Sequence, residues 1–593
     1  MTKILDGLPA SEGIAFGSVR VLDWSIPHVP RRVLAPDQVE GEVERFHEAR
    51  RDVSEHLNRI RQEAAERLGE MEARIFDPQL LMLEDIEVVD DTVRYITEHH
   101  LSAAQAFHWR MLELQQQWRT TANPMVLDRL NDVEDLQVRL LHKLLGLPVP
   151  HVWEEEDGGP IIIVGRNLTP SLTIQMDPDR VVGLATDLGT RTSHWAILAR
   201  SLGIPAVVGL VKASRTVAGA EEAIVDGRIG RLIVDPDPRD RNVYEDRKVR
   251  LQGWEEELAQ ISRLDAITLD GHPVALRANL DLPGEAVKAS EHGAEGVGLF
   301  RTEFLVVGRR AMPGEAEQYE AYRHLAESFP NQAVVIRTFD LGGDKFPMFL
   351  NMPAEENPFL GWRAIRVCLD ELDLFRPQLR AILRATAHGD IRILLPLVND
   401  VEEVVRVREL LGEEEAKLKA DGIPFSSAYK LGILVETPAA ALDAAELARH
   451  SDFFSIGTND LVQYTLAVDR TNAKLADLYN PFHPAVVRQL HQVARVARAA
   501  GIEVSVCGEM AANPLGAFLL VGLDIRALSV AWPTLPEVKK VIRSFRAEDA
   551  RTAARKALAA PTSSDVTHCL VEGLGSAVDL SAFSGRWSLS LPS

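Results

Sequence analysis

The segment LGILVETPAAALDAAELARHSDFFSIGTND, residues 431–460, combines two short apolar runs with a helical pattern between them. Runs of this length and composition are typical of buried strands. The stretch that separates them is rich in alanine and leucine and contains no glycine, as expected for a helix. The segment therefore predicts a strand–helix–strand unit with parallel strands. A carboxylate follows each predicted strand, Glu436 after the first and Asp460 after the second.

The same alternation continues through residues 265–560. Eight strand-like runs occur there, most of them separated by helical patterns: 272–280, 296–304, 333–340, 391–398, 431–437, 453–460, 503–509 and 527–532. Eight strands over about 280 residues match a (β/α)8 barrel. A doubly wound open sheet would also alternate strands and helices, but it would not bring eight strand ends together. We therefore expect the barrel.

The polar residues of this region stand where the apolar runs end: Arg301, Arg337, Glu436, Asn459, Asp460, Cys507 and Glu509. In such a barrel the carboxyl-terminal strand ends build the active site. Arginines hold phosphate and carboxylate through paired hydrogen bonds. Two protein carboxylates, with substrate oxygens and water, are a usual way to hold Mg²⁺. The pattern predicts a small anionic substrate that bears a phosphate, beside a magnesium site at Glu436 and Asp460.

The first 264 residues divide into regions that differ in composition and in hydrophobic period. Residues 1–36 and 147–240 contain short β-rich runs bounded by glycine and proline, which predict an α/β domain. Residues 37–146 carry apolar side chains at helical spacing and predict an inserted helical subdomain. The charged, proline-free stretch 241–264 predicts a linker helix. The tail, 561–593, follows no clear period, and its structure is left unassigned.

The segment GTRTSHWAILARSLG, residues 189–203, places His194 where a turn leads into a helical pattern. Thr192 and Ser193 precede it, and the free N–H groups of a helix start can bind an anion there. A neutral imidazole is a competent nucleophile near pH 7. A single histidine is more often structural, but these features favour one that becomes phosphorylated.

Cys507 is the second candidate for a chemical role. Small buried cysteines are common in cores. A thiol with a pKa of about 8.5 nevertheless stays protonated at neutral pH and can donate its proton to a carbanion-like carbon.

The overall composition excludes several classes of protein. The formal net charge of −22 argues against a nucleic-acid partner and permits attraction to a basic protein. The three cysteines are too widely spaced for a disulfide framework or a CxxC metal site. No apolar run approaches the roughly 20 residues that span a bilayer, and the N-terminus lacks signal-peptide features. We expect a cytoplasmic protein with no membrane insertion.

Together these motifs resemble enzyme I of the bacterial phosphoenolpyruvate:sugar phosphotransferase system, over roughly residues 3–550. The segment 186–209 resembles the phosphohistidine segment of that family. Six further segments resemble the phosphoenolpyruvate-barrel segments of that family: GLFRTEFL (298–305), RTFDLGGDK (337–345), NPFLGWRAIR (357–366), ILVETPAA (433–440), SIGTNDLVQYTLAVDR (455–470) and VCGEMA (506–511). Seven matches in the family's order make a chance similarity negligible.

The resemblance implies a phosphoenolpyruvate-dependent, Mg²⁺-dependent protein phosphotransferase. It would move a phosphoryl group from phosphoenolpyruvate to His194 and then to a histidine of the carrier HPr, as the first step of sugar uptake. It implies a swivelling phosphohistidine domain, an HPr-docking helical subdomain and a barrel that forms a homodimer. The implied substrate-binding residues are Arg301, Arg337, Lys345, Arg363, Asn459, Asp460 and Arg470. Glu436 and Asp460 would hold Mg²⁺, and Cys507 would protonate the enolate.

Three positions depart from the family pattern. Thr190 and Trp195 stand near His194 where relatives usually have small residues, and Glu134 stands where they often have arginine. Trp195 either packs beneath the histidine loop or belongs to the docking surface. Thr190 would be strained if its position required a positive φ.

Two alternative functions remain. A pyruvate-phosphate dikinase or phosphoenolpyruvate synthase shares the barrel and the histidine domain, but it needs an ATP-binding domain for which this chain has no room. A regulatory phosphotransferase that acts on an HPr-like carrier outside sugar uptake fits the changes around His194.

Overall fold

The structure is a computed structural model, and it describes residues 2–68, 73–120, 124–148, 159–190, 193–306, 311–342, 355–470 and 472–578. The chain divides into two compact units, Met1–Gly253 and Trp254–Ser593. Each unit has its own hydrophobic clusters, and each is described by itself below.

The first unit contains an eight-stranded sheet with the order β1-β8-β7-β3-β4-β5-β6-β2. Its central strands β3 (Ile14–Leu22), β4 (Ile161–Gly165), β5 (Val181–Thr186) and β6 (Ala206–Val208) run parallel. The outer strands are antiparallel: β1 (Lys3–Asp6), β2 (Leu8–Ser11), β7 (Glu222–Asp226) and β8 (Arg231–Val234). The strand pairing therefore brings the start of the chain beside residues 161–234.

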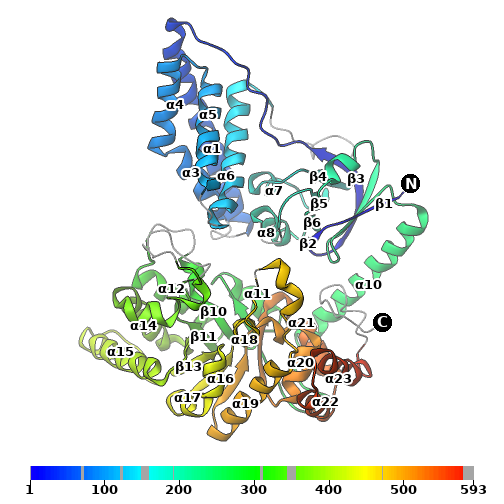
Figure 1. The fold of residues 1–593 in the computed structure, drawn as a ribbon, viewed down its shortest axis with the longest axis vertical. Helices are drawn as coiled ribbons and strands as arrows, with labels where there is room; N and C mark the ends of the chain where they lie inside the picture. Colours follow the sequence, from blue (N-terminus) through cyan, green and yellow to red (C-terminus); the bar gives the residue numbers. More distant parts are fainter. Residues whose placement is uncertain are drawn as a thin grey trace. The chain divides into compact units, whose positions relative to one another are not determined.

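A helical subdomain lies in the chain between β3 and β4 (Figure 1). It consists of α1 (Val39–Leu68), α3 (Asp77–Leu83), α4 (Ile86–His99), α5 (Ala103–Thr120) and α6 (Pro124–Leu145). Phe46, Leu57, Phe107 and Leu140 are among the buried side chains of its own core. A separate apolar core makes the subdomain a packed body rather than a long loop.

The second unit is a closed barrel of eight parallel strands, surrounded by helices (Figure 1). The strands are β9 (Ala275–Leu280), β10 (Val297–Arg301), β11 (Ala333–Arg337), β12 (Asp390–Leu395), β13 (Lys430–Val435), β14 (Phe453–Ile456), β15 (Glu503–Val506) and β16 (Ala527–Ala531). Each of the eight predicted runs contributes one strand. The predicted fold class, including the barrel, is confirmed.

Side-chain alternation divides the barrel interior into layers. Leu299, Val335, Leu394, Leu434 and Phe453 form a buried apolar cluster with Cys507. Because successive residues of a strand face opposite sides, the residue two positions after an inward side chain also points inward. Arg301, Arg337 and Glu436 each follow a member of this cluster by two positions. The strand period thus directs their side chains to the carboxyl-terminal mouth of the barrel.

The second unit also includes helices beyond the last strand. α21 (Leu535–Ser544) and α22 (Ala547–Ala559) follow β16, and α23 (Ser563–Gly575) occupies part of the tail that the sequence left unassigned. The buried residues of α23 are Val566, Leu570 and Leu574. This spacing of four is typical of one face of a helix.

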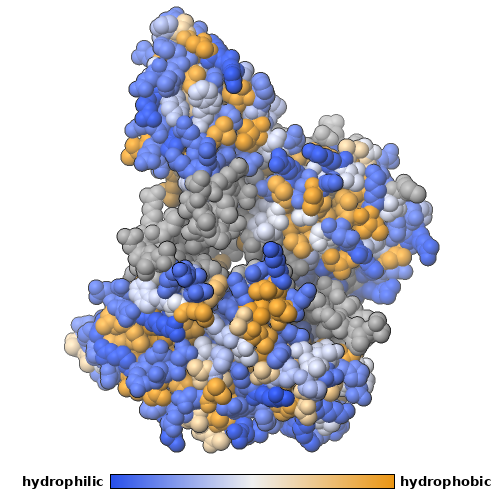
Figure 2. Space-filling model, viewed as in Figure 1, coloured by the Kyte–Doolittle hydropathy of each residue, from blue (hydrophilic) through white to orange (hydrophobic). Residues whose placement is uncertain are grey.

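The surface facing the viewer in Figure 2 is mainly hydrophilic, with separate small apolar patches. Among the residues that the structure describes, no helix combines the length and apolar character needed to cross a membrane.

Candidate active site

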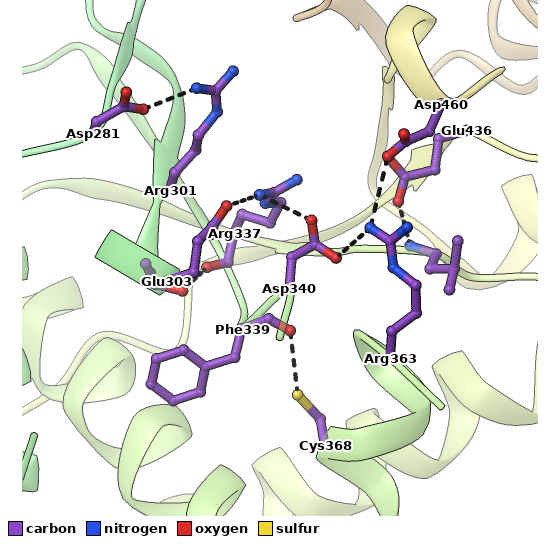
Figure 3. Close-up of polar contacts among 12 residues, drawn as sticks. Asp281, Arg301, Glu303, Arg337, Phe339, Asp340, Arg363, Cys368, Glu436 and Asp460 are labelled. Carbon is purple, nitrogen blue, oxygen red and sulfur yellow. Dashed lines mark hydrogen bonds and ion pairs between the residues drawn. The ribbon is translucent and has the colours of Figure 1, made fainter. Parts of the chain in front are cut away.

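A chain of buried ion pairs lies at the carboxyl-terminal mouth of the barrel (Figure 3). Arg337, the last residue of β11, donates to Glu303 and pairs with Asp340, with Nη2 3.2 Å from Oδ2. The other oxygen of Asp340 accepts a hydrogen bond from Nη2 of Arg363 at 3.1 Å. Asp340 therefore bridges two buried arginines.

Both arginines remain charged in this setting. Burial alone would lower the pKa of each guanidinium, but the neighbouring carboxylates raise it. Glu303 and Asp340 act most strongly on Arg337, and Asp340 and Asp460 act on Arg363. Two buried, fixed cations suit a substrate that carries phosphate and carboxylate groups.

Glu436 and Asp460 lie close together on the other side of Arg363 (Figure 3). Glu436 follows β13, and Asp460 belongs to the first turn of α18 (Thr458–Leu466), which follows β14. Burial, together with the charges of Asp460 and Asp340, raises the pKa of Glu436 to about 8. The backbone N–H of Leu397 donates to Glu436 Oε1 at 2.6 Å. The site thus crowds negative charge that its own cations do not fully balance.

This donor set fits a hard divalent cation. The Oδ1 atom of Asp460 is buried and accepts no hydrogen bond from the described residues. A raised carboxyl pKa and a buried oxygen without a donor are both relieved when a cation binds. Among the described residues, no group of three or more His, Cys, Asp or Glu side chains forms a metal site. A cation at this pair would therefore complete its shell with substrate oxygens and water, as Mg²⁺ commonly does.

Three further predicted residues border the site. Arg301, at the end of β10, donates from Nη1 to Asp281 Oδ1 at 3.0 Å. Arg470 lies near the metal pair, with Nη2 3.8 Å from Asp460 Oδ1. Asn459, next to Asp460, accepts the backbone N–H of Glu509 at 3.0 Å. These contacts bring residues from the ends of β9, β10, β14 and β15 to one rim.

Cys507 lies directly after β15, and only 4% of its surface is exposed. Burial raises the pKa of its thiol. The Asn279 amide donates to the Cys507 carbonyl at 2.9 Å and fixes the backbone there. The next residue must be glycine, because a Cβ at Gly508 would come within 1.9 Å of Thr458 Oγ1. The result is a held, protonated thiol at the mouth of the barrel.

In the first unit, His194 is the first residue of α8 (His194–Ser201). The structure describes its backbone, and its side chain is outside the described set, as are residues 191–192. The turn before the helix is closed by the Thr190 N–H, which donates to Ser193 Oγ at 2.9 Å. Gly189 carries the positive φ of this turn, 110°, and Thr190 does not have a positive φ. The strain considered for Thr190 is therefore absent.

Trp195 belongs to the core of this unit. Its side chain is 2% exposed and packs in a cluster with Leu172, Leu184 and Ala199. A Cβ built on Gly189 would lie 3.7 Å from the indole Nε1, so the ring lies beneath the turn that precedes His194. Of the two expectations for Trp195, the geometry supports packing beneath the histidine loop.

Comparisons with known proteins agree with this arrangement. Three family models match: PEP-utilising enzyme, N-terminal (residues 6–129), PEP-utilising enzyme, mobile domain (158–230), and PEP-utilising enzyme, PEP-binding domain (255–547).

The chain is 38% identical to a phosphoenolpyruvate-protein phosphotransferase of Haemophilus influenzae, over 96% of this chain and 99% of that protein. Proteins of the same name from Buchnera aphidicola and Staphylococcus carnosus are each 37% identical, with the same coverage. The chain belongs to the phosphoenolpyruvate-protein phosphotransferase family. The resemblance inferred from the motifs is confirmed, and the predicted activity agrees with the names of these relatives.

Not every residue predicted for this phosphotransferase site is placed by the structure. Arg301, Arg337, Arg363, Glu436, Asn459, Asp460, Arg470 and Cys507 gather at the barrel mouth. Lys345 is in the segment 343–354, outside the described residues.

Sequence reasoning missed four residues of the site: Asn279, Asp281, Glu303 and Asp340. Asp281 directly follows β9, while Glu303 and Asp340 follow the strand-end arginines of β10 and β11 by two and three positions. For Glu303 and Asp340, the sequence signal was an acidic residue two or three positions after a strand-end arginine, where it can pair with that arginine.

Proposed function

We propose that the chain takes the phosphoryl group of phosphoenolpyruvate onto His194 and transfers it to a histidine of HPr or an HPr-like carrier. The observation that carries this proposal is the combination at the barrel mouth. Two fixed buried arginines lie beside Glu436 and Asp460, where burial and the neighbouring carboxylates raise the pKa of Glu436 to about 8. Such a site accepts a substrate anion and a cation together.

In this proposal the arginines position the substrate. Arg337 and Arg363 cannot turn freely, because Asp340 holds one nitrogen of each. Arg301, Arg470, Asn459 and Lys345 are the further substrate contacts. Phosphoryl transfer depends chiefly on positioning and on neutralising charge, so a rigid cationic cradle is what the reaction requires.

Glu436 and Asp460 would hold Mg²⁺, which supplies positive charge to the phosphoryl and carboxylate oxygens when bound. His194 attacks the phosphorus, and the bond between phosphorus and the enol oxygen breaks. The leaving enolate takes a proton from the Cys507 thiol at its terminal carbon, which yields pyruvate. The raised pKa of Cys507 keeps that proton on sulfur until the enolate forms.

The domain roles follow the sequence prediction. Residues 1–36 and 147–240 would form the swivelling phosphohistidine domain, 241–264 its linker and 37–146 the carrier-docking subdomain. Trp109 and Leu112 are both exposed and lie three positions apart on α5, so they form a neighbouring apolar pair that fits a docking role. A homodimer formed through the barrel, 265–560, and a cytoplasmic location remain predictions.

Labelling with phosphoenolpyruvate tests the proposal. The chain, incubated with ³²P-phosphoenolpyruvate and Mg²⁺, should acquire acid-labile, base-stable label, and His194→Ala should acquire none. Label that persists in the variant would place the nucleophile elsewhere. Adding HPr from the same organism should discharge the labelled protein. Discharge only by another HPr-like carrier would support the regulatory alternative, and labelling by ATP would support the dikinase alternative.

A further inference from the structure

A second polar network contacts Arg301, through Asp281, at the barrel rim. It joins the turn after β9 to the end of β16. The carboxylate of Glu285, the first residue of α11 (Glu285–Glu291), accepts the backbone N–H groups of Asp281 at 2.8 Å and Leu282 at 3.0 Å. These two bonds close the turn that carries Asp281.

The other oxygen of Glu285 is also engaged. Its Oε1 accepts the indole N–H of Trp532 at 3.3 Å. Trp532 directly follows β16, the strand that pairs with β9 to close the barrel. His292 contacts the indole edge-on, with ring centroids 4.8 Å apart, and Lys288 Nζ lies 5.9 Å from the ring centre. The indole is thus held by α11 as well as by its own strand.

The network ends on a residue of the proposed substrate site. Asp281 accepts a hydrogen bond from Nη1 of Arg301 at 3.0 Å. This pair is separate from the Arg337–Asp340–Arg363 chain (Figure 3). Arg301 is about one-third exposed, so its long side chain needs a partner to hold one position. Arg337, in contrast, is buried between two carboxylates. Arg301 therefore depends on the β9–α11 turn for its orientation.

We propose that Glu285 and Trp532 are positioning residues for phosphoenolpyruvate binding, which they act on through Asp281 and Arg301. Glu285 fixes the turn, Trp532 fixes Glu285, and Asp281 holds one edge of the Arg301 guanidinium while the other edge faces the substrate anion. This inference rests on the proposed function, because the role assigned to Arg301 is phosphoenolpyruvate binding.

The test is the dependence of the self-phosphorylation rate on phosphoenolpyruvate concentration, measured by rapid quench without any carrier. Trp532→Phe keeps the ring and removes the N–H donor. Glu285→Gln keeps the shape and removes the charge. Each should raise the half-saturating phosphoenolpyruvate concentration by about fivefold, the order of one lost hydrogen bond, and leave the maximal rate within about twofold. Glu291→Gln, an exposed position of the same helix, is the matched control and should change neither value.

Coupling to Arg301 separates positioning from general stability. In an Arg301→Ala background, Trp532→Phe should have no further effect on half-saturation, because the side chain that it orients is gone. An equal effect in both backgrounds would overturn the proposal and leave Trp532 as a packing residue. A lower half-saturating concentration in Asp281→Asn would overturn it as well, because Asp281 would then compete with the substrate for Arg301.

The outcomes also distinguish this inference from the proposed function. If the unaltered chain is not labelled by phosphoenolpyruvate, the proposed function fails. If it is labelled and both Glu285→Gln and Trp532→Phe behave like it, the function stands and the positioning role is wrong.

Discussion

The two ends of the barrel both combine arginines with carboxylates, and they do so to opposite effect. At the amino-terminal end, Glu503 lies between Arg277 and Arg392, with hydrogen bonds of 2.6 and 2.9 Å. Its pKa is lowered to about 2, because the two guanidinium groups outweigh burial. At the carboxyl-terminal end, burial and two neighbouring carboxylates raise the pKa of Glu436 to about 8.

The contrast separates a structural ion pair from a binding site. Glu503 has its charge balanced by the protein itself, so this end of the barrel gains nothing from a ligand. Glu436 has excess like charge around it, so the folded protein alone leaves this end unbalanced. A carboxyl pKa that burial and like charge raise therefore marks a binding site in this barrel, and one that paired arginines lower marks a structural ion pair.

The largest expected effect comes from removing one of the crowded carboxylates. Asp460→Asn should slow self-phosphorylation by at least about a thousandfold, because two protein ligands are few and the loss of one undoes the cation site. The free energy of unfolding should change by no more than about 1 kcal/mol, because repulsion with Glu436 is relieved. Quenched-flow labelling and urea denaturation measure the two quantities. Near-normal labelling at low Mg²⁺ would remove Asp460 from the cation site.

Glu503 begins β15 and Cys507 directly follows it, so the two ends of the barrel can be compared on one strand. Cys507→Ala should slow pyruvate formation by about a hundredfold, the usual order for losing a general acid. Phosphoenolpyruvate binding should weaken far less, since the thiol acts on the leaving enolate. Lactate dehydrogenase-coupled detection measures the rate of pyruvate formation. Phosphoenolpyruvate binding is measured separately. Unchanged turnover with weakened binding would show that Cys507 is a substrate contact instead.

Glu503→Gln should lower the stability of the barrel and leave its activity nearly unchanged. Leaving Arg277 and Arg392 without their shared carboxylate should destabilise the barrel by about 3 kcal/mol. The labelling rate per folded molecule should stay within about twofold of the original. The urea midpoint of the barrel transition measures the loss of stability. Labelling of the folded fraction measures the activity. A large loss of activity without a loss of stability would make the amino-terminal end part of the active site.

The smallest expected effects are opposite slopes of stability against pH. A carboxyl whose folded pKa is lowered stabilises the fold above its ordinary value, so the contribution of Glu503 is complete above about 4.5 and declines as the pH falls toward 2. The raised pKa of Glu436 favours folding below about 4.5, and that contribution is lost as the pH rises through 8. Melting temperatures without metal, from pH 5 to 9, should fall less steeply in Glu436→Gln than in the unaltered chain. Parallel curves would show that Glu436 has no raised pKa.

The barrel and most of its site could be predicted because both follow from local patterns. Each strand is a short apolar run, and Arg301, Arg337 and Glu436 are the first polar residues after such runs. The period of a strand then directs those side chains inward, with no further information needed.

The supporting contacts could not be predicted, because they join residues far apart in the chain. Trp532 reaches Glu285 across 247 positions, and Asn279 reaches the Cys507 carbonyl across 228. For Trp195, the sequence allowed packing or exposure, and only the tertiary structure shows the ring to be buried. Local patterns locate reactive groups, while the groups that hold them depend on strand order and register.

Calorimetric titration of Mg²⁺ measures whether Glu436 and Asp460 bind the cation. His194→Ala, saturated with phosphoenolpyruvate so that no turnover occurs, is titrated at pH 7 in two buffers of different ionisation enthalpy. We expect one Mg²⁺ site whose binding releases a proton, because Glu436, with a pKa of about 8, is largely protonated before the cation binds. Glu436→Gln in the same background should lose both the site and the proton release, and Glu503→Gln should keep both. Equal Mg²⁺ affinity in the His194→Ala protein with and without Glu436→Gln would show that Glu436 does not hold the cation.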